Sequence, residues 1–455
     1  MNRRSSLISL ITAGALLASL AAVSPALGAG ETAGAAETAA AADHAPGPKE
    51  RNAHWVAAWT SMPQLTEPSN MPPAPFTQAD SVLTDTTLRQ TVHVSAGGDH
   101  IRLRFSNAFG GAVLPLTKVS VALPLDGRAG TGAVREGTTR RVTFGGSASV
   151  TVPAGAQAVS DPLDFRVEPG SNLTATVYLA TGQASTALTS HPGSRTTSYL
   201  RSGDHVEDAD LPGATTTDHW YLLSGVEVWS RSSTSATAVL GDSLTDGRGS
   251  TTNGNDRWPD VLQQRLAAGA GPARISVVNQ AAGGNRLLND GLGPNGLARL
   301  DRDVLAQSGV DRLIVFEGVN DIGTAAATLA AQKGTADDVI AAYDQIITRA
   351  HALGIRVYGA TLTPFGGNTG YDDPDGYREG ARQTVNTWIR TSGRFDEVID
   401  FDRAARDPQN PRALRPSLDV GDHLHLNPAG YRALADAVPA RLFRQSPLPA
   451  GFGYN

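Results

Sequence analysis

The hydrophobic pattern of this 455-residue chain changes its period near Trp229, and that change limits the possible folds more than any other feature. Between His54 and Trp229, apolar and polar residues alternate over short stretches separated by Gly and Pro, which is typical of antiparallel strands. From there to Arg444, apolar runs alternate with stretches of helical spacing, which is typical of a parallel sheet with helical crossovers. We therefore predict a β-sandwich at 54–230 and an α/β domain at 231–447.

Within the sandwich, the clearest pattern is a pair of alternating stretches, 88–94 and 101–105, on either side of the turn 96–99. Two such stretches around a short Gly-containing turn predict a β-hairpin. Further strands are expected at 142–144, 150–152 and 173–179.

The α/β domain has five apolar runs that read as strands, at 237–240, 275–279, 312–317, 355–362 and 397–401. Helical patterns lie between and after them, at 261–266, 297–305, 336–353, 381–390 and 429–442. Strands joined in this way require right-handed crossovers and a parallel sheet covered on both faces. In such sheets, ligands bind beyond the carboxyl ends of the strands.

The N-terminus has the features of a secretory signal, with Arg3 and Arg4 before an apolar run at 7–23 and small residues after it. We predict a signal peptide at 1–28, a flexible leader at 29–53 and a secreted, extracellular protein, with the export route left open. A membrane anchor fits less well because polar residues interrupt the short run, and no other segment is long and apolar enough to span a membrane.

Composition excludes several other classes of function. The net charge of −6 and the lack of a basic cluster interleaved with aromatic residues argue against a nucleic-acid partner. The chain has no cysteine, so cysteine nucleophiles and thiolate metal sites are excluded. No feature of the sequence defines the oligomeric state.

The sequence GDSLTDG at 241–247 directly follows the predicted strand 237–240. At a junction between strand and helix, the Ser243 hydroxyl would lie at the carboxyl edge of the sheet, and its N–H would be among the unpaired donors of the helix start. That is a suitable place for a nucleophile. An isolated Gly-Asp-Ser is more often a turn with a helix N-cap, so the interpretation depends on partner residues elsewhere.

The best partners lie near the other end of the chain, in Asp422-His423-Leu424-His425. A three-residue offset in a loop lets the Asp422 carboxylate reach one ring nitrogen of His425 and leaves the other nitrogen for the serine. His423 is the competing base, and a solvated Asp–His pair is the ordinary explanation of such a spacing. A metal site that uses both histidines is the less favoured alternative because no further ligand cluster is apparent.

An attacked carbonyl develops an oxyanion, which needs hydrogen-bond donors already in place. The segment NQAAGGN at 279–285 can direct the Gly284 N–H into the cleft, with Gly283 as the neighbouring alternative. The segment GVND at 318–321 can present the side-chain amide of Asn320. Taken singly, the two segments are equally explained by a left-handed turn and a helix cap.

The order Ser243, Gly284, Asn320, Asp422 and His425 resembles the SGNH hydrolases, also called the GDSL lipase/acylhydrolase family. The resemblance covers about the last 215 residues, through GDSLTDG, NQAAGGN, GVND and DHLHLNPAGY. It implies a flavodoxin-like three-layer α/β/α fold with a five-stranded parallel sheet, and ester hydrolysis through an acyl-serine. The N-terminal half is similar, less specifically, to the β-rich domain attached to some secreted members.

The resemblance also implies a role for each residue. Ser243 would be the nucleophile, His425 the base and Asp422 the group that orients it. The N–H groups of Ser243 and Gly284 and the side chain of Asn320 would form the oxyanion hole. No cofactor and no metal are implied.

We therefore expect a secreted serine esterase of lipase, acylhydrolase or carbohydrate deacetylase type, acting on an acylated glycan, a lipid or a small ester. The alternative is a carbohydrate- or surface-binding protein whose hydrolase domain is catalytically silent. Four aromatic residues near strand-end loops are candidates for lining a pocket or for packing, and the loop 366–376 is a candidate cleft wall; the four are Trp258, Tyr358, Phe365 and Tyr371.

Overall fold

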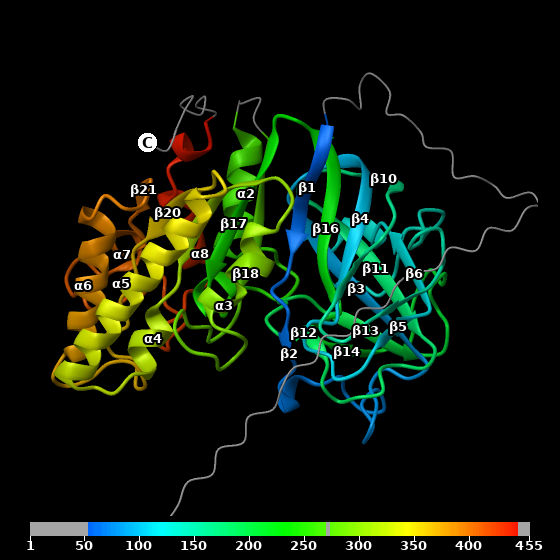
Figure 1. Ribbon diagram of the computed structural model, residues 1–455, viewed down its shortest axis with the longest axis horizontal. Coiled ribbons are helices and arrows are strands. Elements are labelled where there is room, and N and C mark those ends of the chain that lie inside the picture. Colours follow the sequence, from blue (N-terminus) through cyan, green and yellow to red (C-terminus); the bar gives the residue numbers. More distant parts are fainter. Residues whose placement is uncertain (1–52, 270–273, 445–455) are drawn as a thin grey trace, which may run out of the picture. The chain divides into compact units, whose positions relative to one another are not determined.

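The computed structural model describes residues 53–269 and 274–444 (Figure 1). The predicted signal peptide at 1–28, the predicted leader at 29–53 except its last residue, and the last three residues of the predicted domain 231–447 lie outside these ranges. Within the described ranges, no helix combines the length and the hydropathy needed to cross a membrane.

The C-terminal half is organised around a five-stranded parallel sheet. The strands are β17 (Thr234–Gly241), β18 (Arg274–Ala281), β19 (Val310–Phe316), β20 (Arg356–Ala360) and β21 (Glu397–Ile399). Their spatial order is β18-β17-β19-β20-β21. This is the flavodoxin-like order, and it confirms the predicted fold class of this half.

Helices cover the sheet in two groups (Figure 1). One group packs together as α2 (Trp258–Ala268), α7 (Phe401–Ala405) and α8 (Pro428–Ala437), followed by the 3₁₀ helix η4 (Ala440–Phe443). The other comprises α3 (Gly296–Leu300), which continues as the π-helix η3 (Asp301–Leu305), α4 (Val319–Thr324), α5 (Leu329–His351) and α6 (Tyr377–Thr391). Side chains from the strands and from both groups share one buried apolar cluster.

The predicted strand at 397–401 is too long. The strand ends at Ile399, and Phe401 begins α7 because the Asp400 side chain accepts the backbone N–H of Arg403 and caps the helix. Short polar residues compete with the strand ladder in this way, and a hydrophobic pattern does not reveal it. The helix start at Ser243 was predicted, and the structure shows that this helix, α1 (Ser243–Asp246), is a single turn. The short helix α4 was not among the predicted helices, because it is too short for the helical period to detect.

The N-terminal half consists of antiparallel sheets, which confirms its predicted β-rich character. One sheet contains β1 (Ala53–Thr60), β16 (Leu223–Arg231), β4 (Gly98–Ser106) and β10 (Leu163–Val167), with β9 (Gln157–Val159) on β4. A second contains β14 (Thr215–Thr217), β13 (Ser198–Ser202), β3 (Thr86–Val94), β11 (Ser171–Leu179), β6 (Lys118–Ala122) and β7 (Arg140–Val142). Apolar residues of both sheets form one buried cluster, as in a β-sandwich.

Smaller elements complete this half. A three-stranded sheet joins β15 (Trp220–Tyr221), β12 (Thr189–His191) and β2 (Gln64–Leu65), and β5 (Leu114–Leu116) pairs with β8 (Val150–Val152). The 3₁₀ helices are η1 (Pro68–Asn70) and η2 (Leu125–Gly127).

The predicted hairpin at 88–105 is wrong, although both of its strands exist. β3 pairs with β11 and β13, whereas β4 pairs with β16, β9 and β10, so the connection between them carries the chain from one sheet to the other. Ser95 in this connection bonds to Ala58 and Ser276 instead of closing a turn. A period-2 pattern identifies strands but not their partners.

Candidate active site

Ser243 lies where β17 ends and α1 begins, as predicted. Asp242 caps the short helix, because its carboxylate accepts the N–H of Leu244 at 2.9 Å, and Gly247 ends it with φ +97°. The Ser243 side chain is nearly buried, at 7% exposure. Its backbone N–H has no acceptor among the described residues, as expected of a donor in the first helical turn.

His425 and Asp422 form a hydrogen-bonded row with Ser243. The Ser243 Oγ lies 2.9 Å from His425 Nε2, and His425 Nδ1 lies 2.6 Å from Asp422 Oδ2. The other Asp422 oxygen accepts the backbone N–H groups of His425 and Leu424 at 2.8 and 3.0 Å. This loop therefore holds the carboxylate from three sides and leaves Nε2 as the nitrogen that faces the serine.

The pKa values of Asp422 and His425 are both lowered, but for different reasons. Burial acts to raise the pKa of Asp422, but the hydrogen bonds from the backbone and ring of His425 outweigh it and hold that pKa below its usual range. For His425, burial lowers the pKa most and the charges of Arg248 and Arg195 lower it further, against the opposing effect of Asp422. A neutral imidazole beside an ionised carboxylate is the state in which His425 can accept a proton.

The competing histidine faces elsewhere. His423 is exposed, its backbone has φ +62°, and its Nδ1 lies 2.9 Å from Asp419 Oδ2. The structure thus brings His425, and not His423, to Ser243. It also turns the two histidines toward different carboxylates, and no group of three or more metal-ligating side chains occurs in the part of the chain that the structure describes.

The turn after β18 distinguishes Gly284 from Gly283. The Gly283 N–H donates to Asp246 Oδ2 at 3.0 Å, whereas the Gly284 N–H has no acceptor among the described residues. Gly284 has φ +71°, and a Cβ on it would lie 2.5 Å from the Leu292 side chain. A glycine is therefore required here, and its N–H is available to a ligand.

Asn320 lies in the first turn of α4, after β19. Its amide nitrogen donates to the Asn285 carbonyl at 2.8 Å, and its oxygen accepts the Tyr371 hydroxyl at 2.6 Å. These two bonds fix the orientation of the amide, and an amide nitrogen carries a second hydrogen that can donate to a ligand. Ser243, Gly284 and Asn320 all line one cleft with His425.

A buried arginine holds the three strand ends together. The guanidinium of Arg299 donates to the carbonyls of Gln280 and Gly241 and to the Asn285 side chain, and it pairs with Glu317. Burial raises the pKa of Glu317 to about 7, although the charge of Arg299 acts to lower it. Arg299 and Glu317 do not line the cleft. Their network therefore stabilises the loops that carry the site residues without being part of the cleft wall.

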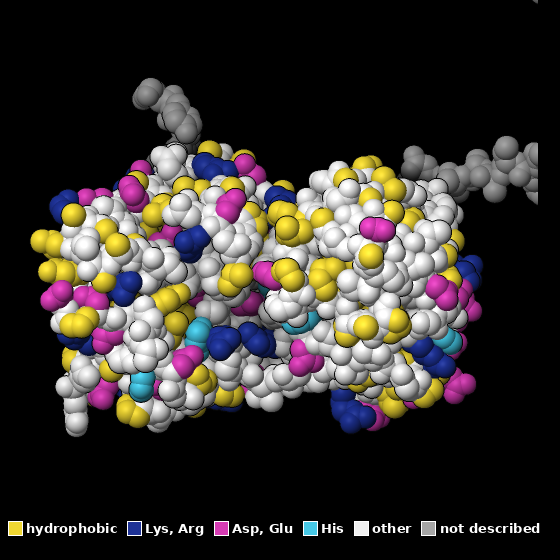
Figure 2. All heavy atoms as spheres, turned by 90° about the horizontal axis from the view of Figure 1, so that it is seen from below, with side chains coloured by type: hydrophobic (Ala, Val, Ile, Leu, Met, Phe, Trp, Pro, Cys, Tyr) yellow, Lys and Arg dark blue, Asp and Glu magenta, His cyan; other side chains and the backbone are white. Residues whose placement is uncertain are grey.

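The cleft has a volume of about 430 Å³, and the β-rich half contributes part of its wall. The sequence left the role of this half open and did not identify these residues; the polar ones are Gln64, Glu67, Asn70, Arg195 and His219. Arg248 and Tyr371 line the cleft from the other half. Figure 2 shows Lys, Arg and His side chains together near the middle of the face that it views.

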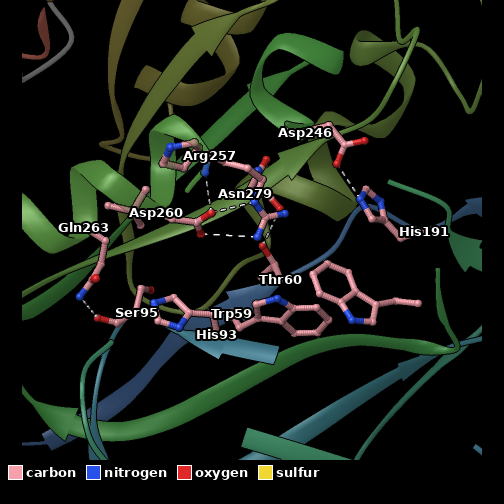
Figure 3. Close-up of a pocket in the computed structure, with 13 residues that line it drawn as sticks. Trp59, Thr60, His93, Ser95, His191, Asp246, Arg257, Asp260, Gln263 and Asn279 are labelled. Atoms are coloured by element: carbon pink, nitrogen blue, oxygen red, sulfur yellow. Dashed lines mark hydrogen bonds and ion pairs between the residues drawn. The ribbon is translucent and has the colours of Figure 1, made fainter. Parts of the chain in front are cut away.

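A buried hydrogen bond links the β-rich half to the turn that carries Gly284. Nε2 of His191, in β12, lies 2.8 Å from Asp246 Oδ1 (Figure 3). The other ring nitrogen of His191 lies 3.0 Å from the Met62 carbonyl oxygen. The second oxygen of Asp246 accepts the Gly283 N–H. One carboxylate thus connects a strand of the first half to the backbone next to Gly284.

Of the four aromatic residues considered for the pocket, Tyr371 lines the cleft, and it comes from the loop 366–376 as expected for a cleft wall. The other three are packing residues of the buried core. Trp258 and Phe365 have no exposed surface, and Tyr358 is 2% exposed.

Comparison with known proteins places the likeness in the α/β half. Residues 239–433 match the model of the GDSL-like Lipase/Acylhydrolase family. No curated protein matches the sequence. A solved structure of a G-D-S-L family protein from Desulfitobacterium hafniense is 20% identical, with 46% of this chain and 99% of that chain covered and a TM-score of 0.35.

Two other solved structures have comparable coverage and TM-scores. A variant of an acetyl xylan esterase from Geobacillus stearothermophilus is 24% identical, with 45% and 92% covered and a TM-score of 0.35. A GDSL-like lipase from Bacteroides thetaiotaomicron is 15% identical, with 45% and 85% covered and a TM-score of 0.33. The segment 239–433 therefore matches the GDSL-like Lipase/Acylhydrolase family model, and its sheet has the flavodoxin-like strand order.

Proposed function

We propose that this protein is a secreted serine esterase that hydrolyses carboxylic esters through an acyl-serine intermediate. The observation that carries the proposal is the row from Ser243 Oγ through His425 to Asp422, beside two backbone N–H groups that have no acceptor among the described residues. Secretion rests on the sequence of residues 1–28 alone.

In the proposed reaction, His425 Nε2 takes the proton of Ser243 as Oγ attacks the ester carbonyl. The N–H groups of Ser243 and Gly284 and the Asn320 amide then stabilise the oxyanion. His425 returns the proton to the departing alcohol, which leaves an acyl-serine. A water molecule activated by His425 hydrolyses this intermediate and releases the acid.

The cleft lining combines polar side chains with apolar ones such as Leu292 and Leu424, and it does not by itself select an acyl-chain length. Hydrolysis of p-nitrophenyl esters from acetate to palmitate, with wild type beside Ser243→Ala, tests the proposal. Turnover that depends on Ser243 is expected. Preference for acetate would indicate a deacetylase, and preference for long chains would indicate a lipase. If no ester gave Ser243-dependent turnover, the binding-protein alternative would gain support.

The pH dependence of kcat/KM should follow the protonation of His425. The base must be neutral to accept a proton, so kcat/KM should rise with pH through the pKa of His425 and level off above it. Because burial and the charges of Arg248 and Arg195 lower that pKa, the midpoint should lie below the ordinary value of 6.5. A pH series of kcat/KM for p-nitrophenyl acetate measures it, and a midpoint above 6.5 would contradict the electrostatic account.

Replacing Asn320 by alanine should lower kcat about a hundredfold or more, with little change in KM, because the amide acts on the oxyanion and not on the bound ester. Tyr371→Phe removes only the bond that orients this amide, so its loss should be smaller. Steady-state kinetics on p-nitrophenyl acetate compare the two. A raised KM with unchanged kcat in Asn320→Ala would show that the amide binds substrate instead.

A further inference from the structure

Two arginines in the cleft have charges that the protein itself does not neutralise. Among the described residues, neither Arg195 nor Arg248 has a carboxylate within ion-pair distance or a hydrogen-bond acceptor for its guanidinium. The next arginine along the chain, Arg257, pairs with Asp260 at 2.8 Å. The cleft carboxylates are engaged elsewhere, since Glu67 accepts two side-chain amides and Asp246 is held by His191.

Arg195 lies in a loop with a strained backbone that hydrogen bonds to Asn253 hold in place. Its φ is +51°, a left-handed conformation that a non-glycine residue adopts at a cost in free energy. The Arg195 carbonyl accepts the N–H of Asn253 at 2.9 Å, and the Asn253 side chain accepts the N–H of Thr197 at 2.8 Å. Two bonds from the α/β half thus fix the backbone on both sides of a position that an unconstrained loop would avoid.

The side chain of Arg195 also has a buried hydrogen-bond donor without an acceptor. Its Nε is buried and has no hydrogen-bond partner. A buried donor without an acceptor is unfavourable, and a guanidinium fork is suited to two oxygens of one acidic group. Arg195 is half-buried and lines the cleft, so the accessible part of its guanidinium can meet a ligand oxygen there.

The position of the two charges shows which part of the substrate they would meet. Both line the same cleft as His425, and the charge of each lowers the pKa of its imidazole. His425 is the proposed proton donor to the departing alcohol, so the alcohol passes the His425 side of Ser243, while Gly284 and Asn320 face the oxyanion. Polar side chains on the same cleft wall, Gln64 and Asn70, can bond to hydroxyl groups.

We propose that Arg195 and Arg248 form an anion-binding subsite for the alcohol part of the substrate. The substrate class is then an acyl ester of an alcohol that also carries a carboxylate, sulfate or phosphate near the ester oxygen. This inference rests on the proposed esterase function and specifies its substrate.

Matched esters test the subsite. 3-Carboxyphenyl acetate and 3-carbamoylphenyl acetate have nearly the same size and differ in charge, and 3-sulfophenyl and 3-phosphonophenyl acetates separate the three acidic groups. Wild type should favour the best acidic ester over the neutral one by about tenfold or more in kcat/KM, and the preference should fall as salt rises. Arg195→Gln and Arg248→Gln should each reduce this ratio, and the double variant should bring it close to one.

Arg166→Gln is the matched control, because Arg166 is exposed, pairs with Glu168 and does not line the cleft. It should keep the wild-type ratio. A ratio near one in wild type, or a ratio unchanged in the double variant, would overturn the subsite while leaving the esterase intact. Loss of Ser243-dependent turnover on every ester would instead overturn the esterase function, and the subsite with it. Because Arg248 is exposed, its variant should fold even if the Arg195 loop is disturbed.

Discussion

Replacement of Ser243 by alanine should lower kcat for p-nitrophenyl acetate by about four orders of magnitude or more, with the fold retained. The change removes the only atom of the side chain that can form the acyl bond, Oγ, and leaves the oxyanion donors in place. A nearly buried methyl group replaces a hydroxyl whose hydrogen bond within the described residues is to His425. Steady-state kinetics and a thermal unfolding curve measure the two parts of this expectation.

A matched control and a chemical probe make the result specific. Ser149→Ala removes the hydroxyl of an exposed serine in the β-rich half and should leave activity unchanged. A fluorophosphonate probe should label wild type and Ser149→Ala but not Ser243→Ala, because the probe reacts only with an activated serine. Labelling that persisted in Ser243→Ala, or activity within tenfold of wild type, would place the nucleophile elsewhere.

The features that the sequence predicted are those encoded locally. The apolar runs before Ser243, Gly284 and Asn320 are strands, and parallel strands necessarily bring their carboxyl ends to one edge. Three short motifs separated by many residues could therefore be placed together without knowledge of any side-chain contact. The same reasoning predicted an Asp–His pair from a three-residue offset, because both residues lie in one loop.

What the sequence could not reveal depends on contacts between distant segments. His191 and Asp246 are 55 positions apart and meet only because β12 lies against α1, which no periodicity encodes. The same holds for Arg195, whose loop is fixed by Asn253 of the other half. The failed hairpin has the same origin, since strand partners are chosen by packing between sheets and not by the alternation within one strand.

The junction of the two halves also explains why the site cannot be understood from the matched segment 239–433 alone. Arg195 and Glu67 belong to the β-rich half, yet they line the same cleft as Ser243. The position of the Gly283–Gly284 turn depends on Asp246, which is held by His191. The β-rich half is therefore part of the candidate active site in this protein and not only a neighbour of it.

The second large effect concerns the choice between two histidines two positions apart. His425→Ala should lower kcat by about four orders of magnitude, because it removes the group that takes and returns the proton, as Ser243→Ala removes the nucleophile. His423→Ala should change kcat by less than about threefold, because its ring is exposed and bonds to Asp419 and not to Ser243. Steady-state kinetics on p-nitrophenyl acetate compare the two variants in one loop.

Each variant is a control for the other, because both change the same loop and remove the same imidazole. A structural effect of losing a histidine would appear in both, whereas loss of the base would appear only in His425→Ala. The double variant Ser243→Ala/His425→Ala should be scarcely slower than either single variant, since the two side chains act as one unit. If His423→Ala abolished activity and His425→Ala were mild, the base would be His423, and the loop would have to rearrange when substrate binds, because the present geometry directs only His425 Nε2 at the serine.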